Sequence, residues 1–329
     1  MAELWEQHIH DKLKELELYL LDEYKKNHPI KEVDYAEYEK EFKTRFYNAM
    51  KELPIMVEKA TNNLHFYRGR GDKPKLKIEQ RLRLLLISQL AGKSNRMMAY
   101  MTRLFSLITG INRSYKTIER LYSDNEVETA LFNLWIILLN KNNVKITDCC
   151  GDATGYGLFI SKHYSSIVQK LKDKAKDSES TKKCFVYKFA LMDLSTKMYV
   201  CFGTSMYSER KAFDKAMQML KETGVKISSI RLDRYYSNPC DLKLFPDSKV
   251  YIIPRKNAKL GHGIKWYETM KAFVEDTMKY LEEYFKRENS ESGWSADKKM
   301  FGWNVKQKRA DRIDTALFVR AIWHNLFRL

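Results

Sequence analysis

The chain has 329 residues, enough for two or three domains of the usual size of roughly 100 to 200 residues. Its formal net charge of +17 favours a polyanionic partner, although lysines that only solvate the surface would give the same balance. The five cysteines include no Cys-x-x-Cys pair, which argues against a zinc site or a disulfide framework. The most apolar run, 130–139, is about half as long as a membrane span of roughly 20 residues, and the N-terminus lacks a cleavable signal, so we expect a cytoplasmic protein without membrane contact.

Residues 1–66 are predicted to form a helical N-terminal region of two amphipathic helices. The first apolar face is made of Ile9, Leu13, Leu16 and Leu20, and the second of Tyr35, Tyr38, Phe42, Phe46 and Ala49. Aromatic residues at helical spacing are usually core, so the second stripe is assigned no functional role. A helix pair at this place could also form a dimer or DNA contact.

Residues 67–77 combine Gly, Pro and basic residues and are predicted to be a linker, either solvated or in contact with phosphates. Residues 78–143 are predicted to be helical again. A short helix from Tyr115 to Tyr122, with Ser114 as its N-cap, resembles the recognition helix of a helix-turn-helix. Lys116 and Arg120 share one face of it and are candidate DNA-reading residues, but any small helical bundle would give the same pattern.

From residue 144 the pattern changes to strands that alternate with helices. Strands are predicted at 144–150, 184–192, 197–202, 227–232 and 249–253, and helices at 208–222, 264–289 and 311–329. The second and third strands should form a hairpin. We therefore expect an α/β domain over 144–329, with a mixed five-stranded sheet and flanking helices. The charged segment 170–183 is predicted to be a surface excursion.

Two aspartates each follow a hydrophobic run that is predicted to be a strand. Asp152 stands in the segment Gly-Asp-Ala-Thr-Gly, and Asp233 follows the fourth strand. A single aspartate there is more often a helix cap or a turn former. Two of them at predicted strand ends favour a site in the crevice of the sheet. Asp148, four residues upstream on the same predicted strand, is the obvious substitute for Asp152.

A third acid belongs to a longer pattern. Tyr284, Arg287 and Glu291 are spaced so that they share one helix face, and Lys298 follows. Ion pairing would explain Arg287 with Glu291 but neither the tyrosine nor the lysine. At these positions the chain resembles the DDE transposases of bacterial and archaeal insertion sequences, which carry a Y-x2-R-x3-E-x6-K signature. The resemblance covers roughly 144–329.

The resemblance implies an RNase H-like catalytic domain that cleaves transposon ends and joins the freed 3′-hydroxyls to target DNA. It implies Asp152, Asp233 and Glu291 as catalytic acids and ligands of two Mg²⁺ ions, for which Mn²⁺ would substitute. Expected DNA-binding residues are Tyr284, Arg287 and Lys298 of the signature. To these we add Arg255, Lys256 and Lys259, which form either a second basic cluster at the same cleft or a plain surface loop.

The expected partners are double-stranded DNA, as transposon ends and target, and a second copy of the chain in the DNA complex. The expected place is the cytoplasm of a prokaryote, at the nucleoid. Two other functions stay open: a catalytically inactive, domesticated or regulatory DNA-binding protein, and an RNase H-like DNA nuclease. Trp294 and Trp303 are core residues by default, and the alternative is that one of them stacks on a base extruded from the DNA.

Overall fold

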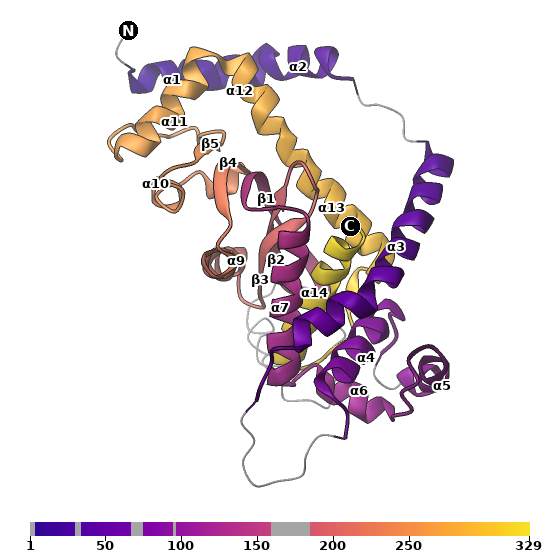
Figure 1. Ribbon diagram of the computed structural model, residues 1–329. Helices are drawn as coiled ribbons and strands as arrows, with labels where there is room; N and C mark the ends of the chain where they lie inside the picture. Colours follow the sequence, from indigo (N-terminus) through magenta and orange to yellow (C-terminus); the bar gives the residue numbers. More distant parts are fainter. Residues whose placement is uncertain (1–3, 30–33, 67–74, 95–96, 159–184) are drawn as a thin grey trace, which may run out of the picture.

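The computed structural model describes residues 4–29, 34–66, 75–94, 97–158 and 185–329. The predicted excursion at 170–183 and most of the predicted linker, 67–74, lie outside these residues. Helices surround a central sheet, and the N-terminal helices lie across one end of the molecule (Figure 1). Within the described ranges, no helix is long and apolar enough to cross a membrane.

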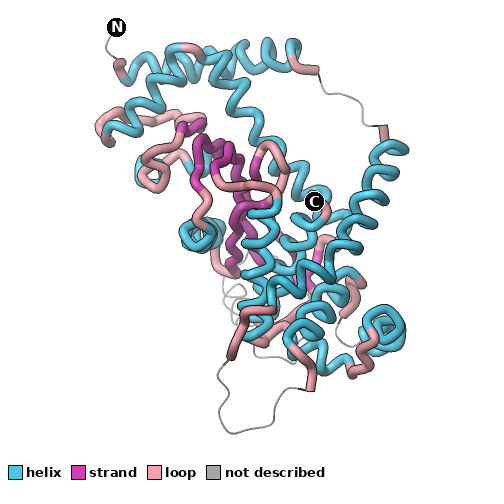
Figure 2. The backbone as a smooth tube through the Cα atoms, viewed as in Figure 1, coloured by secondary structure: helices cyan, strands magenta, loops and turns pink. Residues whose placement is uncertain are grey.

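The sheet is mixed, as predicted, and contains the predicted hairpin. Its strands are β1 (Ile146–Leu158), β2 (Phe185–Asp193), β3 (Tyr199–Ser205), β4 (Lys226–Leu232), β5 (Lys249–Tyr251) and the short β6 (Asn304–Val305). The order is β3-β2-β1-β4-β5, and β6 pairs with the end of β1. The first three strands are antiparallel neighbours, whereas β4 and β5 run parallel to β1. Figure 2 shows the strands together at the centre, with helices around them.

The first strand is longer than predicted, because it continues through Asp152 instead of ending before it. Two glycines of β1 allow close packing inside the sheet. A Cβ on Gly151 would lie 2.6 Å from Leu191 Cδ2, and one on Gly155 would lie 2.9 Å from Phe185 Cδ2. Glycine in a strand interior often marks such a close approach. Asp152 therefore projects from within a strand that is paired on both sides.

Helices cover both faces of the sheet. Adjacent residues of a strand point to opposite faces, and on β2 the ring of Phe189 meets Phe213 while Lys188 reaches Asp297. Phe213 belongs to α9 (Glu209–Thr223), and Asp297 to α13 (Glu288–Phe301). The last helix, α14 (Ala310–Leu326), is buried almost all round and packs against β3, α4 and α7.

The N-terminal region is helical, as predicted. It contains α1 (Glu6–Glu15), a π-helical turn η1 (Leu16–Leu20), α2 (Leu21–Asn27) and α3 (Tyr35–Thr61). The stripe from Ile9 to Leu20 is buried, and α1 packs on α11, so this face is not free for a dimer contact. The core interpretation of the second stripe is wrong for its first turns, because Tyr35 is 70% and Tyr38 is 40% exposed.

A second helical group connects this region to the sheet. It consists of α4 (Ile78–Leu90), α5 (Met98–Thr109), α6 (Tyr115–Leu121) and α7 (Asn125–Lys141). Trp135 of α7 donates its indole N–H to Val200 O of β3 at 3.1 Å, which ties these helices to the sheet. The predicted short helix at Tyr115 is confirmed, although the Ser114 side chain caps none of its backbone N–H groups.

The predicted long helix 264–289 is broken and also extends further. It consists of α11 (Ile264–Glu275), α12 (Thr277–Tyr284), the 3-10 turn η3 (Phe285–Arg287) and then α13. Asp276 interrupts it, with φ −144 and ψ 77, and its side chain accepts a hydrogen bond from Lys279 N at 3.1 Å. Such local side-chain bonding by aspartate competes with helix and favours a cap. The short helix α10 (Pro239–Leu242) precedes β5.

Candidate active site

Asp152 and Asp233 lie side by side because their strands are paired in parallel. Gly151 of β1 is the partner of Leu232 of β4, and each acid is the next residue of its chain segment. Both side chains are half-buried. Asp233 stands at the end of its strand, as predicted, and begins the 3-10 turn η2 (Arg234–Tyr236).

The third acid approaches from the helix that covers this face. Alternate residues of β1 point toward α13: Ser290 Oγ donates to Cys150 Sγ at 3.0 Å, and Lys298 Nζ donates to Thr154 Oγ1 at 2.6 Å. Asp152 lies between Cys150 and Thr154 on the same side of the strand. It therefore faces the part of α13 that lies between Ser290 and Lys298. Glu291 lies in this part, where the exposed side of the helix begins.

The electrostatics show that these acids are close enough to affect one another. Burial, together with the negative charges of Asp233 and Glu291, raises the pKa of Asp152 to about 6. The backbone N–H of Ala153, 2.8 Å from Asp152 Oδ1, and the guanidinium of Arg287 oppose this rise. A buried carboxylate with like charges nearby is a common feature of functional sites.

Glu291 is turned toward Arg287, whose Nη1 lies 3.0 Å from its Oε1. In this arrangement, no three His, Cys, Asp or Glu side chains of the described ranges lie close enough together to hold one metal ion. The donors themselves suit a hard divalent cation, since all are carboxylate oxygens. A site made of all three acids requires the Glu291 side chain to turn away from Arg287.

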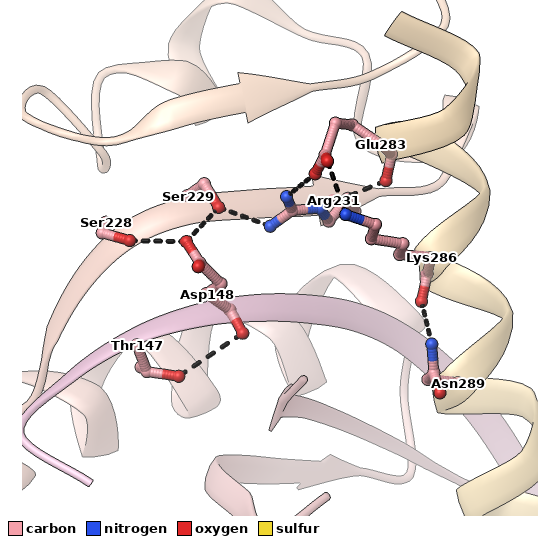
Figure 3. Close-up of polar contacts among 8 residues, drawn as sticks. All are labelled: Thr147, Asp148, Ser228, Ser229, Arg231, Glu283, Lys286 and Asn289. Carbon is pink, nitrogen blue, oxygen red and sulfur yellow. Dashed lines mark hydrogen bonds and ion pairs between the residues drawn. The ribbon is translucent and has the colours of Figure 1, made fainter. Parts of the chain in front are cut away.

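Asp148 has a different environment, which separates it from Asp152 (Figure 3). Ser228 Oγ donates to its carboxylate at 2.5 Å, and Ser229 Oγ donates to the same oxygen. Burial acts to raise the pKa of Asp148, but these hydrogen bonds outweigh it and hold the pKa below its usual value. Arg231 then links Ser229 to Glu283 of α12. Asp148 is therefore part of a satisfied network that joins β1, β4 and α12.

Comparison with known proteins adds to this geometry. No family model matches the chain. Over 280 residues, which is 84% of the chain and 83% of the relative, it is 44% identical to a protein of Archaeoglobus fulgidus named "Probable transposase for insertion sequence element ISA1214". The chain belongs to the transposases of insertion sequences. The predicted membership in the insertion-sequence transposases is thereby confirmed, whereas the DDE group and the roles of the signature residues remain predictions.

In the transposase, the signature residues do different things from one another. Tyr284 is buried, and the guanidinium of Arg287 lies 5.6 Å from the centre of its ring. The tyrosine thus orients the arginine and is not itself exposed. Lys298 is held by Thr154, and its ammonium lies 4.6 Å from the ring centre of Trp303, which is 65% exposed. Trp294 is buried, in agreement with the default core interpretation.

The second basic cluster is divided in the structure. Arg255 Nη2 donates to Tyr235 O at 2.9 Å, which places it against the turn that follows Asp233. Lys256 instead forms an ion pair with Glu17 of the N-terminal helices at 3.0 Å. The carbonyl of Lys259 accepts the indole N–H of Trp266 at 2.6 Å. Of these three residues, only Arg255 contacts a segment that adjoins one of the acids, the turn after Asp233.

The candidate reading helix α6 lies near α5, at the end of the transposase opposite α1 and α2 (Figure 1). Arg120 lines a cavity of about 580 Å³ there, together with Lys75 and Arg113. Lys116 is on the same short helix, one turn earlier. The structure therefore does not bring Lys116 and Arg120 together with the three acids.

A buried charged group behind the site was not predicted from the sequence. Lys188 is completely buried, and its Nζ lies 3.4 Å from Asp297 Oδ2. Tyr199 OH donates to the same oxygen at 3.0 Å, and His324 Nδ1 lies 2.7 Å from Asp297 Oδ1. The sequence contained one indication of this group, because a lysine interrupts the otherwise apolar run of β2. Its partners come from distant segments and could not be inferred.

Proposed function

We propose that this transposase cuts DNA at the ends of its insertion sequence and joins the freed 3′-hydroxyls to target DNA by metal-dependent phosphoryl transfer. The observation that carries the proposal is the placement of the acids. Asp152 and Asp233 are neighbours across two central strands, and Glu291 comes from the helix on the same face. Their charges act on one another, as the raised pKa of Asp152 indicates.

Asp152, Asp233 and Glu291 would together hold two Mg²⁺ ions, or Mn²⁺ in their place. When bound, the ions would stabilise charge on the attacking and leaving oxygens of the phosphodiester. The Arg287 guanidinium, released from Glu291, would bind a phosphate through its planar fork. Tyr284 would keep that guanidinium in place from below.

Lys298 would supply a second phosphate contact. Its hydrogen bond to Thr154 fixes the ammonium two residues along β1 from Asp152. Desolvation lowers the pKa of Lys298, so the charge is poorly solvated in the absence of an anion. A phosphate next to it would restore favourable interactions for the ammonium.

The DNA itself would be double-stranded and bound first through its phosphates, which a net charge of +17 supports. We assign sequence reading to α6 through Lys116 and Arg120, and backbone contact near the site to Arg255. We further propose an RNase H-like fold for the α/β domain, supported by the mixed sheet with acids on β1 and after β4. Two ends joined to one target require paired active sites, hence a homodimer on DNA.

A nicking assay tests the proposal. A duplex that carries an end sequence of the element is incubated with the transposase and Mg²⁺, and we expect a nick at the end and strand transfer of the 3′-hydroxyl. Asp152→Asn should abolish both, while Asp148→Asn, the matched control on the same strand, should retain them. Binding without cleavage by the unaltered protein would indicate a regulatory protein. Equal cleavage of unrelated DNA would indicate a general nuclease.

A further inference from the structure

A groove of about 380 Å³ lies between α3 and α13, on the other flank of the helix that carries Glu291. The two helices approach each other beside the C-terminus of the chain (Figure 1). The groove is lined by tyrosines, cations and small residues of α13, among them Tyr35, Tyr38, Arg45, Lys197, Lys299 and Arg328. One acid, Glu41, accompanies four cations in this lining, so the groove is strongly positive.

The groove lies close to the candidate active site. Ser292 and Lys299 line it and directly follow Glu291 and Lys298 in the sequence. Since one residue turns an α-helix by about 100°, the groove begins roughly a quarter turn around α13 from the face with the acid. The helix with its side chains is about 10–12 Å across, so a strand that leaves the acids over the exposed side of α13 reaches the groove within a few nucleotides.

The positive charge of the groove is incompletely matched by the chain. Arg45 Nε is buried and has no hydrogen-bond partner among the described residues, and the ion pair of Arg45 with Glu41 is long, at 3.8 Å. Burial lowers the pKa of Arg328, and the charge of Arg45 lowers it further. Two guanidinium groups that destabilise each other are a favourable place for an anion, which would interact with both.

The two tyrosines make the groove different from a simple phosphate site. Tyr35 is 70% and Tyr38 is 40% exposed, so the rings are open to a ligand instead of packed in the core. Cations that follow a backbone, with aromatic rings on which bases stack, are the combination that binds single-stranded nucleic acid. A groove of this volume admits one strand, whereas a duplex cannot enter it.

We propose that this groove binds a single DNA strand as it leaves the active site, with its phosphates on Arg45, Lys299 and Arg328 and an unpaired base against Tyr35 or Tyr38. The proposal rests on the proposed function for the identity of the ligand. It adds a second site to the transposase, which would hold the strand adjoining the cleaved end apart from its complement.

The test compares two DNAs by fluorescence anisotropy: a blunt duplex of the element end, and the same duplex with a single-stranded oligothymidine extension. The double variant Tyr35→Ala/Tyr38→Ala should bind the extended DNA about 5- to 150-fold more weakly, the range expected for the loss of one stacked base. Its affinity for the blunt duplex should stay within about twofold. Tyr47→Ala is the matched control, because Tyr47 is 67% exposed on the same helix and does not line the groove.

A charge variant gives an independent measurement. Lys299→Glu should selectively weaken binding of the extended DNA. Lys43→Glu should not, because Lys43 is also exposed but lies outside the groove. Unchanged binding of the extended DNA by both groove variants, or an equal loss on both DNAs, would overturn the proposal. All measurements use the full chain without Mg²⁺, so they do not depend on cleavage. Selective binding by a protein that never cuts DNA would sink only the proposed function.

Discussion

Two acids on the same helix, Glu291 and Asp297, have opposite environments. Asp297 is buried, and its oxygens contact Lys188, Tyr199 and His324. Burial acts to raise the pKa of Asp297, but the charges of His324 and Lys188 outweigh this and lower it. A buried acid with several partners at hydrogen-bond distance has its charge compensated within the fold, and its role is to attach α13 to the sheet and to α14.

Glu291, by contrast, has a side chain that is 55% exposed, and within the described part of the chain its ion pair is with Arg287. The acids near it, Asp152 and Asp233, repel one another, and the Ala153 N–H and the Arg287 guanidinium compensate this only in part. The two groups of acids should therefore respond differently to substitution. Removing a compensated buried charge should cost stability, whereas removing an uncompensated one should cost activity and leave the fold intact.

The largest effect is expected at the uncompensated acids. Asp152→Asn or Asp233→Asn should reduce strand cleavage by a factor of about 1,000 or more, since metal ions supply several kcal/mol of charge stabilisation. The free energy of unfolding should stay equal or rise, because repulsion between the carboxylates is relieved. Cleavage kinetics and urea denaturation measure the two quantities. A clear loss of stability in these variants would contradict the comparison.

At Asp297, the compensated acid, we expect a loss of stability. Asp297→Ala leaves the buried ammonium of Lys188 without its carboxylate, and should lower the free energy of unfolding by about 3–5 kcal/mol. The double variant Lys188→Met/Asp297→Leu removes both charges and is the matched control, expected to recover most of this loss. Urea denaturation of both variants tests it. A loss below about 1 kcal/mol in Asp297→Ala would mean that the group is not a buried ion pair in solution.

A further prediction concerns the cations of α6, the helix that we expect to read the DNA sequence. Lys116→Ala with Arg120→Ala should lower the preference for end DNA over random DNA by about 5- to 150-fold, the discrimination expected for one good base contact. Helix α6, which carries both residues, lies away from β1, β4 and α13, so cleavage of DNA already bound should continue at an unchanged rate. Competition binding measures the preference. An unchanged ratio would place sequence reading elsewhere in the chain.

Much of this arrangement could be predicted from the sequence, because it depends on local patterns. Apolar, β-rich runs predicted the strands, and the spacing of Tyr284, Arg287 and Glu291 predicted a shared helix face, although the predicted helix stopped at residue 289. The extent of β1 could not be predicted, since the role of Gly151 depends on Leu191 of the neighbouring strand. The exposure of Tyr35 depends in the same way on what packs against α3. Such contacts between distant segments leave no local pattern.

The smallest effect is expected at Asp148. This residue is also the closest to compare with Asp152, because it lies four residues away on the same side of β1. Asp148→Asn keeps an oxygen that can accept from Ser228, so strand cleavage should stay within about twofold. The pKa of Asp148 is lowered in the fold, so its charge stabilises the protein at a pH above the unfolded pKa, and this contribution disappears as the pH falls through the folded pKa. Because Asp148 is exposed and solvent screens its charge, the variant should lose below about 1 kcal/mol at neutral pH and nothing in strong acid. Urea denaturation across this pH range measures the loss, and a thousandfold drop in cleavage would instead make Asp148 a member of the site.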